Sequence, residues 1–114
     1  MTPPVPLLSA PAEWTVERVP LVEATVRGLL APAGTRLVVD LSATTFLASA
    51  GLTFLIHLGK RLADAGGGLA LANPTAAVLK LLRAVGLTRV LPAFDSVEEA
   101  RAFVSAARPI PSRP

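Results

Sequence analysis

The spacing of hydrophobic residues changes along the chain and predicts two buried strands joined by a helix. Residues 37–41 form an almost unbroken apolar run rich in β-branched side chains, which is typical of a strand buried on both faces of a parallel sheet. A second short apolar run, residues 69–72, predicts another strand. Between them, residues 50–65 place apolar side chains on one face of a helix. The core face of that helix is expected to consist of Leu52, Leu55, Ile56, Gly59, Leu62 and Ala63.

Residues that start and stop helices mark further elements on both sides of this unit. Pro20 suits the first turn of an earlier helix. Asn73, followed by Pro, is typical of an N-cap, and Gly86 is typical of the left-handed residue that ends the same helix. Residues 89–91 form a short strand candidate, and residues 96–99 form a capping box before a last helix. Strands that alternate with helices predict an α/β layer architecture.

Length and composition point to one globular domain. The chain has 114 residues, of which 52% are hydrophobic and 17% charged, so it can bury a core that offsets the entropy of ordering the chain. Both ends are rich in proline, which disrupts regular structure. We therefore expect a disordered start over residues 1–6, a domain over residues 7–107 and a disordered tail over residues 108–114.

Composition also narrows the classes of function. The chain has no Cys and a single His, His57, which disfavours thiol and zinc chemistry. Its eleven basic and eight acidic residues are spread out, which gives little support to nucleic-acid binding. No catalytic grouping or phosphate-binding loop can be assembled. We expect a protein that is not an enzyme, needs no cofactor or metal and does not bind nucleic acid.

One long uncharged stretch raises the question of a membrane span. No charged residue lies between Asp40 and Lys60. This uncharged stretch is long enough to cross a bilayer. Polar residues interrupt this stretch, and a strand that leads into a helix explains it without lipid. The first residues lack the basic and apolar regions of a signal peptide. We expect a cytoplasmic protein without direct membrane insertion.

An ordered series of motifs runs from about residue 12 to about residue 106. Its centre is Val-Val-Asp-Leu-Ser-Ala-Thr-Thr-Phe-Leu-Ala-Ser-Ala-Gly-Leu over residues 38–52, an apolar strand followed by a turn into a helix. Supporting segments lie at residues 12–20, 61–67, 85–92 and 96–100. The series resembles the STAS family, whose small bacterial members are anti-anti-sigma factors, also called anti-sigma factor antagonists. The resemblance implies an α/β fold in which about four helices pack on a mixed sheet. Its first strand is expected to be shortened or absent, because prolines interrupt the segment before Trp14.

The resemblance also implies a phosphorylation site. In the family, a Ser or Thr directly after an Asp in the turn into the helix is phosphorylated by a partner anti-sigma factor kinase, and Ser49 occupies that position. This chain departs from the pattern at three places: Ala48 replaces the Asp, Ala50 replaces a second hydroxyl residue, and Thr15 replaces an upstream Asp. The expected partner is an anti-sigma factor serine kinase, which supplies and uses the ATP.

Two interpretations of Ser49 remain open, one from the residues themselves and one that the resemblance implies. A Ser at the end of an apolar run and the start of a helix is typical of an N-cap, which stabilises a helix by about 1 kcal/mol. A phosphate at a helix N-terminus is stabilised by the same N–H groups and by the helix dipole. Ser49 is therefore expected to be either a switched phosphate acceptor or a cap that only contacts a partner.

The helix that follows Ser49 is expected to present a docking surface. Phe54 and Leu58 lie opposite the predicted core face and are expected to be partly exposed. His57 lies beside them, and a solvated surface His is the alternative to a role in ligand binding or pH sensing. Gly51 either leaves the backbone open to approach or allows close packing. The expected partner-binding residues are Ala48, Ser49, Ala50, Gly51, Phe54, His57, Leu58 and Arg61.

Asp40 stands at the end of a predicted strand, where α/β proteins often place functional groups. We expect it to orient the Ser49 loop by accepting hydrogen bonds from backbone N–H groups.

The sequence thus suggests an anti-sigma factor antagonist that binds an anti-sigma factor, releases a sigma factor for transcription and is switched by phosphorylation at Ser49. Two alternatives remain. One is a STAS regulatory subunit of a phospholipid-transport ABC complex, which would hold an ATPase subunit permanently. The other is a degenerate STAS protein that cannot be phosphorylated, as Ala48 suggests. A ragged first strand would also leave a sheet edge through which two copies could form a homodimer.

Overall fold

The computed structural model describes residues 5–106. Residues 1–4 of the predicted disordered start, residue 107 of the predicted domain and the predicted tail over residues 108–114 lie outside that range. Val5 and Pro6 were expected to precede the ordered domain, but they belong to it. Val5 is buried, and its carbonyl accepts a hydrogen bond from Arg101 Nε at 3.1 Å. The carbonyl of Pro6 accepts one from Val38 N at 3.1 Å. The described domain therefore begins at least two residues earlier than predicted.

The main sheet has four parallel strands in the order β1-β3-β5-β6. The predicted strands at its centre are β3 (Arg36–Asp40) and β5 (Gly68–Ala72). The edges are β1 (Leu7–Ser9), which is short as expected, and β6 (Ala93–Phe94). A mixed sheet was expected, but every pairing among the described strands is parallel, because helices connect the successive strands of the sheet.

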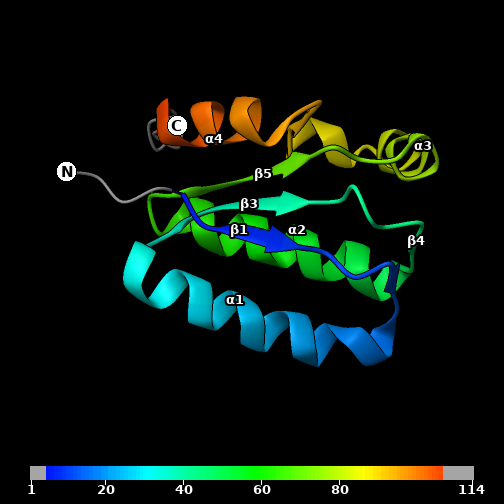
Figure 1. Cartoon of the computed structure of the whole chain (residues 1–114), viewed down its shortest axis with the longest axis horizontal. Helices are drawn as coiled ribbons and strands as arrows, with labels where there is room; N and C mark the ends of the chain where they lie inside the picture. The colour runs from blue at the N-terminus through cyan, green and yellow to red at the C-terminus, as the bar shows by residue number, and fades with distance from the viewer. Residues whose placement is uncertain (1–4, 107–114) are drawn as a thin grey trace.

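Helices cover both faces of the sheet (Figure 1). On one face lie α1 (Val19–Ala33) and α2 (Ser49–Asp64), and on the other lies α4 (Val97–Ala106). The fourth helix, α3 (Ala76–Ala84), lies beyond the end of β5. A parallel sheet with four helices, three of them on its faces, confirms the predicted α/β architecture.

Alternate residues of the central strands build two cores. Leu37 and Val39 of β3 face the larger core under α1 and α2. Val38 faces the smaller core under α4, where Ala70 and Ala100 are also buried. The small side chains of the second core let α4 approach the sheet closely. This double burial explains why β3 is apolar at successive positions.

The start of α3 differs from the prediction. Thr75, rather than Asn73, is the N-cap, and its Oγ1 accepts a hydrogen bond from Val78 N at 3.3 Å. Asn73 instead adopts a left-handed backbone with φ of 54°, and its N–H donates to Phe94 O at 2.8 Å. Asn tolerates this conformation better than most residues, so the chain turns there and the helix begins later.

The end of α3 is partly as predicted. Gly86 has a left-handed φ of 76°, which confirms its role as the residue after the helix. The strand predicted at residues 89–91 is wrong: a 3₁₀ turn, η2 (Leu87–Arg89), occupies this region, and Leu91 N donates to Leu87 O at 2.8 Å. These local hydrogen bonds use the backbone groups that a strand would need, so the strand forms later, as β6.

The last helix begins as its sequence predicts. Ser96 Oγ accepts a hydrogen bond from Glu99 N at 3.1 Å, which is the first half of the predicted capping box. No helix within residues 5–106 is long and apolar enough to cross a membrane.

Candidate functional site

The loop from β3 to α2 is fixed at its start by Asp40. Asp40 Oδ1 accepts a hydrogen bond from Ser42 N at 3.0 Å, which forms a tight turn directly after the strand. The side chain therefore shapes the beginning of the loop that leads to Ser49.

Thr44 anchors the middle of the same loop and is fully buried. Its Oγ1 donates to Pro11 O at 2.9 Å, and its carbonyl accepts from Thr75 Oγ1 at 3.2 Å. These hydrogen bonds join the loop to the segment after β1 and to the start of α3. Sequence reasoning missed this residue, because one Thr among several in a loop carries no distinguishing signal.

A second, two-stranded sheet fixes the end of the loop. It pairs β2 (Glu13–Trp14) with β4 (Phe46–Leu47) in parallel. The next residue, Ala48, donates its N–H to Trp14 O at 2.9 Å. These hydrogen bonds therefore fix the backbone as far as Ala48, the residue before Ser49. Phe46 of β4 leaves 54% of its surface exposed.

Ser49 is the first residue of α2 and is exposed. The prediction that it is the N-cap is wrong: Ala48 holds that position, with φ of −78° and ψ of 165°, and no side chain caps the helix. Because the capping residue has no hydroxyl, the N–H groups of the first turn lack a side-chain acceptor. Among residues 5–106, the Ser49 hydroxyl has no hydrogen-bond partner, so it is free to react or to bind.

Gly51 is buried and packs against Trp14 rather than facing solvent. A Cβ atom at this position would lie 2.7 Å from Leu47 Cδ1 and 3.0 Å from Trp14 Cγ. The Trp14 ring is itself fully buried and lies 6.0 Å from the ring of Phe54. Gly51 thus allows the first turn of α2 to approach Trp14, and it is not available for the partner contact that we expected.

Phe54 and Leu58 are also less exposed than expected, with 8% and 1% of their surfaces accessible. The reason is α1, which packs beside α2 and buries Val22 and Val26 in the same core. Because α2 is covered by the sheet and by α1, its buried face is wider than one apolar stripe. Conversely, Ile56 was expected in the core but is 45% exposed.

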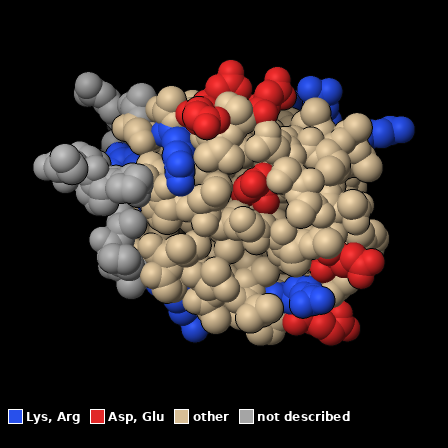
Figure 2. Space-filling view, in the orientation of Figure 1, with Lys and Arg blue, Asp and Glu red and all other residues tan. Residues whose placement is uncertain are grey.

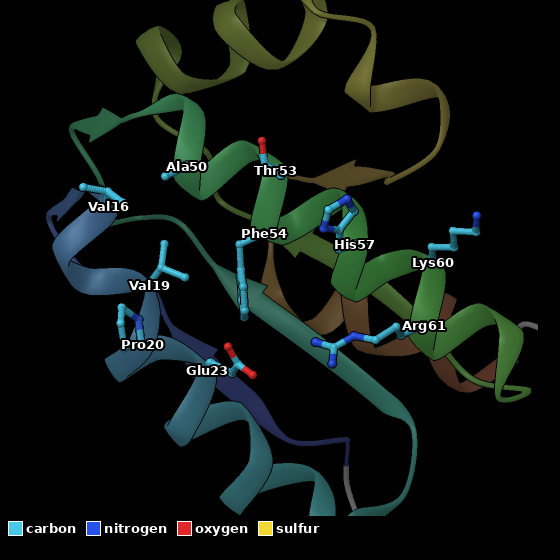
Figure 3. Close-up of a pocket in the computed structure, with 10 residues that line it drawn as sticks. All are labelled: Val16, Val19, Pro20, Glu23, Ala50, Thr53, Phe54, His57, Lys60 and Arg61. Atoms are coloured by element: carbon cyan, nitrogen blue, oxygen red, sulfur yellow. The ribbon is translucent and has the colours of Figure 1, made fainter.

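A groove of about 790 Å³ lies beside Ser49, between the first part of α1 and the outer side of α2 (Figure 3). Part of its wall comes from the 3₁₀ turn η1 (Val16–Arg18), which precedes α1. The predicted residues Ala50, Phe54, His57 and Arg61 line this groove, whereas Ser49 adjoins it through Ala50. The structure therefore gathers half of the predicted partner-binding residues around one feature.

Charged side chains are sparse on one face of the molecule (Figure 2), and metal-binding side chains form no cluster among residues 5–106. On the face shown in Figure 2, charged side chains of both signs lie mostly around the edge of a largely uncharged surface. Within residues 5–106, no group of three or more His, Asp or Glu side chains could hold a metal ion. The site offers a free hydroxyl at a helix N-terminus and a neighbouring groove.

The fold defines a small α/β domain with a parallel sheet covered on both faces. The family model described as "Mlab, STAS domain" matches residues 1–92, so the chain belongs to the STAS domain family. This confirms the resemblance found in the sequence. No significant match to a curated protein was found.

Solved structures share this fold at low sequence identity. A Thermotoga maritima protein proposed to be an anti-sigma factor antagonist is 24% identical, with 87% of each chain covered and a TM-score of 0.75. An anti-sigma-factor antagonist (STAS) domain protein from Planctomyces limnophilus is 20% identical, with 88% of this chain and 90% of that chain covered and a TM-score of 0.75. The murine anion transporter Solute Carrier 26 family member A9 is 18% identical, with 92% of this chain but 18% of the transporter covered and a TM-score of 0.70.

Proposed function

We propose that this protein is an anti-sigma factor antagonist whose activity is switched by phosphorylation of Ser49. The unphosphorylated protein binds an anti-sigma factor serine kinase at the start of α2, and this binding releases a sigma factor for transcription. The observation that carries the proposal is the exposed and unpaired Ser49 hydroxyl on the first turn of α2, beside a groove. Membership of the STAS family supports the same function.

Electrostatics at the start of α2 suit a reversible phosphate. A phosphoryl group adds about 1.5 to 2 negative charges at neutral pH, and free N–H groups at a helix N-terminus favour such a charge. Both neighbours, Ala48 and Ala50, are uncharged, so neither repels the phosphate. Inside a protein interface the same charge would have to lose its water, which is costly. Phosphorylation would therefore be tolerated by the free protein and would weaken the complex.

A second function is favoured by the description of the matching family model, "Mlab, STAS domain", and by the absence of the Asp that the resemblance leads us to expect before Ser49. In this alternative, the protein is a STAS subunit of a phospholipid-transport ABC complex and holds its ATPase partner permanently. The same surface would bind the partner, but Ser49 would not switch it.

Calorimetric titration of the candidate anti-sigma factor distinguishes the two functions. The proposal predicts that wild-type protein binds, that prior incubation of the two proteins with Mg-ATP abolishes binding and that Ser49→Ala resists this effect. Ser49→Asp should weaken binding at least tenfold, whereas Ser105→Asp, a matched change on the exposed side of α4, should not. Binding that survives Mg-ATP and Ser49→Asp would contradict the switch. Retention of a transporter ATPase through gel filtration, independent of nucleotide, would support the alternative.

A further inference from the structure

The groove beside Ser49 has an apolar end formed by the start of α1 and the first turns of α2. Val16, Val19 and Pro20 line one wall, and Phe54 points into the space between the helices (Figure 3). Val16 leaves 62% of its surface exposed, so it is open to contact from outside. The lining continues on α2 from Ala50 to Arg61, which corresponds to about 16 Å along a helix.

The other end of the groove is positively charged. Arg61 and Glu23 point toward one another across it (Figure 3). However, Glu23 pairs with Arg27 one turn further along α1, and within residues 5–106 Arg61 forms no ion pair. Lys60 lies at the rim and is exposed. Glu23 is therefore the only carboxylate among the residues that line the groove, which also include the cations Lys60 and Arg61, so this end of the groove has positive charge left to attract an anionic group.

We infer that this groove binds an amphipathic helix of the partner protein, with apolar side chains against Val16 and Phe54 and a carboxylate against Arg61. The inference deepens the proposed function, on which it rests for the identity of the partner as an anti-sigma factor. It adds a docking site that extends about three helical turns beyond Ser49 and specifies the chemistry of the segment that fills it.

A helix fits this groove better than an extended segment. The walls are mainly helices, whose backbone groups are already bonded within each helix, so they offer no edge to which a strand could pair. A helix satisfies its own backbone groups and needs only side-chain contacts. The proline-rich end of this chain, residues 107–114, is a poor occupant, because its charged side chains are Arg108 and Arg113. Both side chains are positively charged, like the end of the groove around Arg61, and would be repelled by it.

The only Trp of the chain can report on this site. Trp14 is fully buried, and its ring lies 6.0 Å from that of Phe54, which lines the groove. A helix that contacts Phe54 should therefore change the fluorescence of Trp14.

Two fluorescein-labelled helical peptides of about 14 residues provide the test, because this length spans the groove. The first peptide carries Leu at positions i, i+4, i+7 and i+11 of an Ala-rich helix with Glu on both flanks, and the second has Lys in place of every Glu. Fluorescence anisotropy should show that the acidic peptide binds the full chain at least about tenfold more tightly than the basic one. The positive charge around Arg61 attracts the Glu side chains of the first peptide and repels the Lys side chains of the second. Unlabelled acidic peptide should also shift the emission of Trp14.

Two charge-reversal variants locate the binding. Arg61→Glu should reduce the preference for the acidic peptide at least about tenfold. Arg83→Glu makes the same change on the exposed side of α3, away from the groove, and should leave the preference unchanged. Both positions are exposed on helices, so neither variant should prevent folding, which circular dichroism can check.

Three outcomes would overturn the inference: equal binding of the two peptides, no binding of either at about 1 mM, or equal effects of the two variants. A fourth would be a dimer of the chain alone that Arg61→Glu dissociates in gel filtration, because a second copy would then occupy the groove. The peptide assay contains no kinase and leaves Ser49 unchanged. Its failure would therefore remove the docking helix but not the proposed switch, and loss of the switch would not affect the peptide result.

Discussion

Gly51→Ala should destabilise the protein, although Ala normally favours a helix over Gly. A Cβ atom at residue 51 would lie 2.7 Å from Leu47 Cδ1 and 3.0 Å from Trp14 Cγ. The Leu47 methyl can rotate away, but the buried Trp14 ring is held by the pairing of β2 with β4. The new methyl group must therefore displace either the ring or the first turn of α2.

The size of the effect follows from two opposing contributions. Replacing Gly by Ala in a helix contributes up to about 1 kcal/mol, and less near a helix end. Forcing one extra carbon atom into a packed core typically costs about 1–3 kcal/mol. We expect Gly51→Ala to lower the free energy of unfolding by about 1–2 kcal/mol, because the Trp14 contact outweighs the helix preference.

Gly28→Ala is the matched control. Gly28 lies in the middle of α1, is exposed, and has no atom within 4 Å of the position that a Cβ would take. This substitution should raise the free energy of unfolding by about 0.5–1 kcal/mol, because only the helix preference acts.

Urea unfolding followed by Trp fluorescence and far-ultraviolet circular dichroism measures both variants. Gly51→Ala should lower the urea midpoint and Gly28→Ala should raise it. If Gly51→Ala stabilised the protein as much as Gly28→Ala, the close packing of α2 on Trp14 would be refuted. The arrangement of the Ser49 turn derived from that packing would then be refuted with it.

Two further predictions concern hydrogen bonds that fix the elements around the site. Thr44→Val should lower the free energy of unfolding by about 1–2 kcal/mol in urea, because the hydrogen bond to Pro11 O is lost in a buried position. The same change at Thr45 should cost less than about 0.5 kcal/mol, because the hydrogen bond that Thr45 Oγ1 donates to Ala12 O at 3.3 Å is exposed and water can replace it. Ser96→Ala should cost about 1 kcal/mol in thermal unfolding, because Glu99 N loses its capping acceptor, and an unchanged melting temperature would contradict the cap.

The elements that the sequence predicts correctly are those with a strong local signal. The apolar run of β3 and the helical spacing of α2 are local patterns, and both elements appear close to their predicted bounds. The left-handed Gly86 and the Ser96 cap are also decided within a few residues. The strand predicted at residues 89–91 failed because a short apolar run suits a 3₁₀ turn as well as a strand.

The site was harder to predict, because its shape depends on contacts between distant segments. Helical spacing placed Phe54 and Leu58 opposite the core, but it could not show that α1 packs against that side of α2. Gly51 is buried by Trp14, which lies far away in the sequence. Local sequence could place Ser49 near the start of a helix, but it did not determine that Ala48 would hold the capping position.

The most direct test of the central claim is the intact mass of the purified protein after incubation with the candidate anti-sigma factor kinase and Mg-ATP. Wild-type protein should gain one phosphoryl group, Ser49→Ala should gain none, and the exposed Thr53, one turn further along α2, should remain unmodified in peptide mapping. This result would establish Ser49 as the acceptor and show that an Asp at position 48 is dispensable. No gain of mass in the wild-type protein, while the kinase still binds it, would contradict the proposed switch.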